Sequence, residues 1–166
     1  MKLFWKNETT TATSRNMNTK TKALKAKDLT HEFPRSPRET LAGYVLAARV
    51  LDKCRAAIAG TLGEYHFDCP LDRFLFEFAG INAESFRSLV ATGADDEAVA
   101  AWITEHAAQH SRIEIIKWNN RIRETCVGDM PEEIQEFLEG YIHKHLPAGR
   151  VVYRWLDVYD IEEKRL

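Results

Sequence analysis

Signals that begin and end helices recur along this chain from residue 31 onward. Ser36, Pro37 and Glu39 form a capping-box pattern with proline at the first helical position, and Gly60 ends the helix predicted from there. Within each later segment the apolar residues recur at helical spacing. Five further helices are predicted, beginning at Pro70, Asn82, Asp95, Ser111 and Asp129–Pro131.

Strand signals do not gather at the regular spacing that a sheet requires. We therefore predict an all-α fold, a small irregular helical bundle. The segment 151–159 stays open, because its spacing fits a helix whereas Val-Val-Tyr at its start favours a strand. With 166 residues, 45% of them apolar, the chain is long enough to bury a real core. We predict one all-α domain over residues 29–166.

Charge divides the chain into two parts. Residues 1–30 carry seven Lys or Arg against Glu8 and Asp28, a balance of +5, whereas the remainder has a balance of −7. The leading segment also lacks apolar periodicity, so we predict a disordered basic tail over residues 1–28, with Met17 as a second candidate start. A basic arm can dock on nucleic acid or acidic membranes, but the acidic body argues against a nucleic-acid-binding domain.

Cysteine usage and hydropathy bear on the compartment. The three cysteines, Cys54, Cys69 and Cys126, are odd in number and contain no CxxC pair, which is typical of a reducing compartment. No window approaches the ~20 consecutive apolar residues of a membrane span, and the N-terminus lacks a signal-peptide apolar stretch. We therefore expect a soluble, cytoplasmic protein with no membrane partner.

Two dense stretches, PRSPRETL from Pro34 and GEYHFDCPLD from Gly63, resemble a bacterial family known as domain of unknown function 5069. The similarity extends more loosely through Lys117–Asn119 to Trp155–Asp160, and so covers nearly everything after the basic tail. The resemblance implies a small bacterial cytoplasmic protein with no established activity. It transfers no catalytic roles, so the chemistry has to be deduced from the residues.

Two ionic residues interrupt the apolar face of the first predicted helix. At 100° per residue, Asp52 and Arg55 fall within the stripe of apolar side chains. Buried charges are costly unless paired, and residues three apart on a helix are neighbours that can pair with each other. The two residues form either a structural ion pair or one wall of a polar pocket, where a ligand completes the network.

The loop that follows this helix, residues 63–72, concentrates titratable side chains. If it is extended, Glu64, His66 and Asp68 project to one face. Ligands two residues apart on one segment rarely close a coordination sphere, so we predict no metal site.

Cys69 precedes the helix opened by Pro70, where backbone N–H groups and the helix dipole favour a thiolate. It is therefore the best nucleophile candidate, with His66 as its base and Asp68 as a further catalytic candidate. The alternative is helix capping by Asp68 or Cys69, with Asp72 favouring the first turn.

Arg35 and Arg38 flank the predicted start of the first helix. Two guanidiniums at a helix N-terminus would favour an anion such as phosphate or carboxylate. Pairing with acidic groups of the loop, or with Asp157 and Asp160, explains the two arginines equally well.

The sequence establishes neither the function nor a cofactor. We interpret the chain as a small-molecule or anion-binding module with a pocket between the first long helix and the GEYHFDCPLD loop. One alternative is a thiol-dependent enzyme that uses Cys69 and His66. Another is a protein-interaction domain, with a homodimer as one form, whose polar cluster is purely structural. The predicted ligand-binding residues are Arg35, Arg38, Asp52, Arg55, Glu64, His66 and Asp72.

Overall fold

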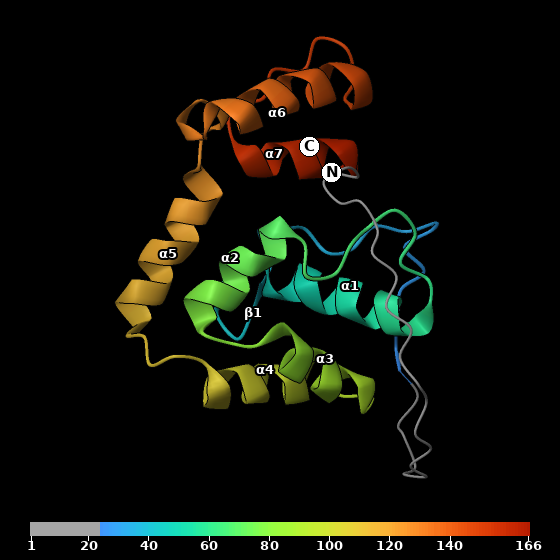
Figure 1. Cartoon of the computed structure of the whole chain (residues 1–166), viewed down its shortest axis with the longest axis vertical. Helices are drawn as coiled ribbons and strands as arrows, with labels where there is room; N and C mark the ends of the chain where they lie inside the picture. The colour runs from blue at the N-terminus through green and yellow to red at the C-terminus, as the bar shows by residue number, and fades with distance from the viewer. Residues whose placement is uncertain (1–23) are drawn as a thin grey trace.

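A computed structural model describes residues 24–166, and the predicted tail lies outside the described residues as far as residue 23. The all-α prediction is confirmed, because this part of the chain folds into seven α-helices and one small hairpin (Figure 1). In chain order the elements are β1 (Thr40–Leu41), β2 (Tyr44–Val45), α1 (Ala47–Ala59), α2 (Pro70–Ala79), α3 (Ala83–Ala91), α4 (Asp96–His106), α5 (Arg112–Glu124), the 3-10 helix η1 (Val127–Asp129), α6 (Glu132–His145) and α7 (Trp155–Glu162).

The predicted caps set the ends of the middle helices. The Asn82 side chain accepts hydrogen bonds from the first backbone N–H groups of α3. The Asp95 side chain accepts one from a backbone N–H group in the first turn of α4. Ser111 and Glu114 form the predicted capping box of α5. Gly80 ends α2 with φ +64°, a left-handed conformation that glycine adopts without a steric penalty.

The predicted start of the first helix is wrong, because α1 begins at Ala47 and not after Ser36. The Ser36–Glu39 pattern closes a turn, in which the Ser36 N–H donates to Glu39 Oε1 over 3.0 Å. The chain then makes a hairpin with Ala42 and Gly43 at its tip. Both have positive φ, 52° and 84°, as a type I′ turn requires, and this interrupts any helix from Pro37.

The open C-terminal segment turns out to be mostly helical. Helix α7 begins at Trp155, and Arg154, directly before it, makes an isolated antiparallel bridge with Cys126. The helix that the spacing favours is thus found from Trp155 onward, whereas residues 151–153, where Val-Val-Tyr favours a strand, form none.

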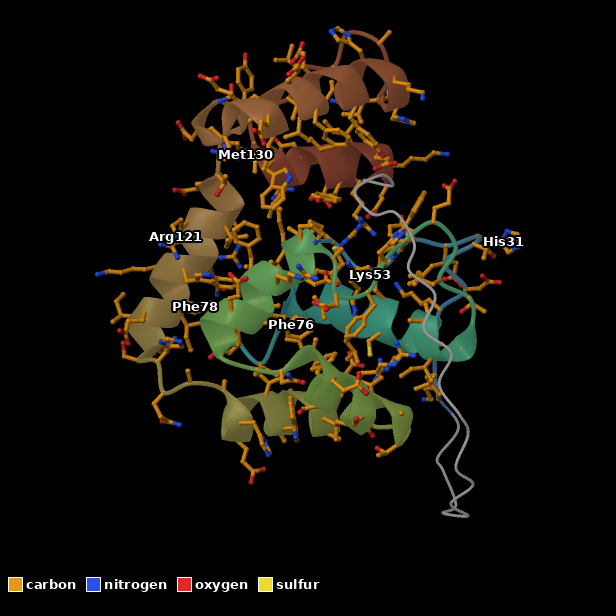
Figure 2. All side chains as sticks on the ribbon, viewed as in Figure 1. His31, Lys53, Phe76, Phe78, Arg121 and Met130 are labelled. Carbon is orange, nitrogen blue, oxygen red and sulfur yellow. The ribbon has the colours of Figure 1, made fainter. Side chains whose placement is uncertain are left out.

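Figure 1 shows α6 and α7 stacked above α1 and α2, with α3 and α4 below and α5 running along one side. Within the described residues, no helix is both long and apolar enough to cross a bilayer. Every residue of α1 from Ala47 to Ala56 is buried, so this helix is surrounded on all sides. In Figure 2 Phe76 lies toward the α3–α4 layer, while Arg121 points outward from α5.

Two further contacts fix the edges of the body. Asn119 of α5 accepts the Val45 N–H over 3.0 Å and donates to the Gly43 carbonyl over 2.7 Å, which holds the hairpin against α5. Residues 24–28, part of the predicted tail, lie against the body. Leu24 packs on the core, and Lys27 Nζ is 3.5 Å from the Asp52 carboxylate.

Candidate functional site

Four charged side chains of α1 are buried, and each is paired outside its own helix. The residues are Arg49, Asp52, Lys53 and Arg55, with exposed fractions of 2%, 4%, 2% and 8%. Asp52 and Arg55 therefore turn inward as predicted, but they do not pair with each other. Because the helix is surrounded, its charges point into three separate clusters.

The first cluster joins α1 to α4 through Arg35. Asp52 Oδ1 lies 2.7 Å from Arg35 Nη2, and Asp96 accepts from both Arg35 and Arg55 over 2.6 Å. The predicted pairing of Asp52 with Arg55 is thus replaced by a chain of four alternating charges. Lys27, 3.5 Å from Asp52, adds a third cation at one end, and every charge of this cluster has a partner within the protein.

The second cluster contains Arg38 and the C-terminal helix. Arg38 forms ion pairs with Asp157 and Asp160, which is the alternative that the sequence offered for it. Arg35 and Arg38 therefore reach different carboxylates and do not converge on an anion. Arg49 of α1 lies in the same region, where Glu163 accepts from Nη2 over 2.6 Å and from Nη1 over 2.9 Å.

The guanidinium of Arg49 is further enclosed by aromatic rings. It lies over the rings of Tyr65 and Tyr159 at 5.5 and 5.1 Å, and the Tyr65 hydroxyl donates to Glu163 over 2.9 Å. Arg165 also pairs with Glu163. The contacts of Glu163 and Arg49 connect α7 to both α1 and the loop after it.

Lys53 carries the third cluster, and all three of its N–H donors have acceptors. Nζ donates to Asp72 Oδ1 over 2.6 Å, to the His66 carbonyl over 3.0 Å and to Cys69 Sγ over 3.3 Å. The side chains of Lys53 and Asp72 are only 3% and 1% exposed. Cys69 is the N-cap of α2, but its side chain makes no capping hydrogen bond. Its sulfur instead faces the ammonium.

The predicted extended form of the loop is wrong, because two turns interrupt it. Gly63 has φ +61°, and a Cβ there would lie 2.7 Å from the Leu29 carbonyl oxygen, so only glycine fits. Asp68 also has a positive φ, 57°. Glu64, His66 and Asp68 therefore do not share one face, and the His66 ring lies against the Glu64 carbonyl.

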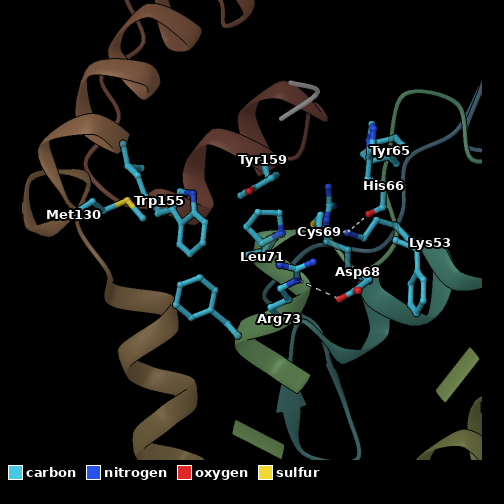
Figure 3. A pocket seen from close by; sticks show the side chains of 15 residues that line it. Lys53, Tyr65, His66, Asp68, Cys69, Leu71, Arg73, Met130, Trp155 and Tyr159 are labelled. Atoms are coloured by element: carbon cyan, nitrogen blue, oxygen red, sulfur yellow. Dashed lines mark hydrogen bonds and ion pairs between the residues drawn. The ribbon is translucent and has the colours of Figure 1, made fainter. Parts of the chain in front are cut away.

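A cavity of about 450 Å³ opens between this loop and the C-terminal helices. Figure 3 shows Lys53 and His66 at one end and Trp155 and Met130 at the other, with Leu71 and Tyr159 between them. Its apolar wall comprises Leu71, Phe74, Met130, Ile134, Trp155 and Tyr159.

Two N–H donors of buried side chains that line the cavity have no hydrogen-bond partner within residues 24–166. They are Trp155 Nε1 and Arg49 Nε, on side chains that are 4% and 2% exposed. Buried polar groups are nearly always hydrogen-bonded, and an unmet donor costs about 1–3 kcal/mol. Both nitrogens have less than 1 Å² of accessible surface, so they are covered by protein atoms and do not open onto the cavity.

The cations that line the cavity are already neutralised. Arg49 pairs with Glu163 and Lys53 with Asp72, while Arg73 at the mouth pairs with Asp68. Within the described residues, no three His, Cys, Asp or Glu side chains are grouped so as to hold a metal ion.

The predicted site residues fall into two groups. His66, Asp68 and Cys69 line the cavity, and Asp72 holds Lys53 beside it. Arg35, Arg38, Asp52 and Arg55 lie in the ion networks described above, and Glu64 is not part of the cavity wall. Four residues of the cavity wall were not predicted from the sequence as site residues: Arg49, Lys53, Trp155 and Tyr159. Arg49 and Lys53 could have been found because they are charged residues on a helix that otherwise consists mostly of apolar or small residues.

The buried ion pairs predict how stability depends on pH. Burial alone would raise the pKa of Glu163, but hydrogen bonds and charges from Arg49 and Arg165 outweigh it and lower that pKa below its ordinary 4.5. A carboxylate whose pKa is lower in the folded state stabilises the fold above the unfolded pKa, and this contribution disappears as pH falls through the folded pKa. We expect the free energy of unfolding to fall below about pH 4.5, measured by urea unfolding between pH 3 and 7.

Glu163→Gln is expected to flatten this acid dependence, because the variant has no proton to take up at that site. The matched control is Glu139→Gln, whose carboxylate is 71% exposed in a surface pair with His143. An acid dependence unchanged in Glu163→Gln would contradict the prediction.

Together these features describe a small helical domain with a ligand-sized, mainly apolar cavity and buried ion pairs at one end of it. The chain belongs to the family DUF5069, described as a domain of unknown function, whose pattern matches residues 31–165. The resemblance seen in the sequence is thereby confirmed. A search of the curated proteins returns no match to this chain.

Proposed function

We propose that this domain binds a small, neutral, largely apolar molecule. The observation that carries the proposal is the cavity of about 450 Å³ beneath α7, whose wall is mainly aromatic and aliphatic. Ligand pockets are typically about 300–1,000 Å³, mostly apolar, with a few placed polar groups.

The paired charges favour a neutral ligand over the anion considered from the sequence. Arg49 and Lys53 each have a buried carboxylate beside them, so an added anion would meet no net positive charge there. The aromatic and aliphatic wall, which includes Leu71 and Trp155, supplies the apolar contact.

The setting we propose is the cytoplasm of a bacterium. Three free cysteines, one of them exposed, support a reducing compartment. A homodimer and the absence of nucleic-acid binding remain predictions.

Prodan, a neutral naphthyl ketone whose emission shifts to the blue in apolar surroundings, tests this proposal directly. We expect saturable prodan binding to the full chain, and binding about ten- to a hundredfold weaker in Ile134→Trp. The larger ring would occupy the cavity, and overlap of this kind costs about 1–3 kcal/mol.

Ile113→Trp on α5 is the matched control, because Ile113 is 55% exposed and lies outside the cavity wall. The thermal midpoints of both variants show whether the fold is retained. Equal prodan affinity in the two variants, or no saturable binding to the wild type, would overturn the proposed function.

A further inference from the structure

We propose that the apolar cluster Leu3–Trp5, in the basic N-terminal segment, occupies the cavity beneath α7 when no ligand is bound and competes with the ligand for it. The inference rests on the proposed function and adds a built-in regulator to it. This occupant lies outside the described residues, and its composition, its reach and its charge support the assignment.

The composition of the N-terminal segment sets this cluster apart. Residues 1–23 are rich in Thr, Asn and Lys, and Leu3, Phe4 and Trp5 form their only run of consecutive apolar residues. Polar segments of this kind carry few aromatic residues, because they bury no core of their own. Two adjacent aromatic side chains therefore indicate a contact with an apolar surface elsewhere, and Trp is among the residues that most often anchor such contacts.

The cavity offers an apolar surface of the right size. Its volume of about 450 Å³ is typical of pockets that enclose a drug-sized molecule, and Figure 3 shows Leu71, Met130 and Trp155 along it. Phe74, also in the wall, is 42% exposed although its ring centroid lies 5.4 Å from that of Trp155. Aromatic rings inserted from the cluster would cover this exposed ring.

The connection between the cluster and the body is long enough. Residues 6–23, eighteen in number, precede Leu24, where the described chain begins, and they span about 60 Å when fully extended. The Leu29 N–H donates to the Thr61 carbonyl over 2.9 Å, and Thr61 is four residues before Tyr65 in the cavity wall. Leu24 and that wall are therefore at most about 40 Å apart, which the connection can cross.

Charge favours the same contact. Residues 1–23 carry five Lys or Arg against Glu8, whereas the chain after residue 30 has a balance of −7. This attraction raises the concentration of the segment near the body without selecting a position on it. The apolar cluster supplies the selection, because it matches the aromatic and aliphatic wall.

A tethered competitor weakens the apparent affinity of the cavity for a ligand. A segment joined by a short connection is present at an effective concentration of the order of millimolar. A cluster that binds with a dissociation constant of about 0.1–0.5 mM would then raise the apparent dissociation constant of a competing ligand about three- to tenfold.

The double variant Phe4→Ser/Trp5→Ser of the full chain tests the inference. We expect prodan to bind this variant about three- to tenfold more tightly than the wild type, because the competitor is removed. Met17→Ser is the matched control, since it removes an apolar side chain from the same segment but outside the cluster, and its prodan affinity should equal that of the wild type. The thermal midpoints show that the body stays folded.

Amide hydrogen exchange measured without prodan locates the contact. Exchange across residues 65–71, which line the cavity, should be slower in the wild type than in the double variant, because the bound cluster covers this segment. Met17→Ser should exchange like the wild type. The affinity ratio between wild type and double variant should not depend on protein concentration, because competitor and cavity belong to one chain.

The outcomes distinguish this inference from the proposed function. Saturable prodan binding of equal affinity in the wild type and the double variant overturns the inference alone. No saturable binding in either chain overturns the proposed function, and equal hydrogen exchange in the two chains would then overturn the inference as well. An affinity ratio that grows with protein concentration would assign the competitor to a second copy and contradict competition within one chain.

Discussion

Glu163→Ala is expected to lower the free energy of unfolding by about 3–5 kcal/mol, because it leaves a buried guanidinium without its carboxylate. Arg49 is 2% exposed, and both of its terminal nitrogens donate to Glu163. Unlike a buried lysine, an arginine cannot escape the cost by losing its proton. Urea unfolding at neutral pH measures the effect.

The double variant Arg49→Met/Glu163→Leu distinguishes a buried ion pair from ordinary packing loss. Replacing both charges by apolar side chains should recover most of the stability lost in Glu163→Ala. As a surface control, Glu139→Ala removes an exposed pair with His143 and should change stability by less than about 1 kcal/mol. A double variant no more stable than Glu163→Ala would contradict this account.

Phe86→Ala is expected to cost a similar amount, about 3–5 kcal/mol, for a different reason. The Phe86 side chain is fully buried, and its ring centroid lies 5.7 Å from that of Phe76, 6.2 Å from that of Trp102 and 6.4 Å from that of Phe67. Its removal leaves a cavity among three aromatic rings that cannot easily collapse.

The effect of Phe86→Ala should extend to the loop before α2. Phe67 lies in that loop, two residues before Cys69, so the loss of its stacking partner should speed amide hydrogen exchange across residues 61–69. Phe33→Ala is the control, since Phe33 is 40% exposed. Equal losses of stability in the two variants would refute the packing argument.

The helices that could be predicted are those whose ends are encoded locally. Asn82, Asp95 and Ser111 each satisfy N–H groups two or three residues ahead, so the signal and the structure lie in the same short segment. The same reasoning failed at Ser36, where an identical signal closes a turn. The hairpin that follows places Ala42 at positive φ. Alanine rarely adopts this conformation, so the sequence does not predict it there.

The site could be predicted only in part, for a related reason. The sequence placed Asp52 and Arg55 on a buried face, because periodicity is a local property. Their partners, Arg35 and Asp96, come from other parts of the chain, and periodicity carries no information about them. Cys69 was identified from its position before Pro70, but the cation that faces it depends on how α1 packs against α2.

The two ends of the cavity come from opposite ends of the folded chain. Lys53 and His66, at one end, lie in its first half, whereas Met130 and Trp155, at the other end, belong to its last forty residues. During synthesis the pocket is therefore completed only when α7 leaves the ribosome and docks. A molecule bound there would contact both parts of the chain and stabilise the docking of the last helices on the rest. Truncated chains that lack these helices would lack one end of the cavity and could not bind it.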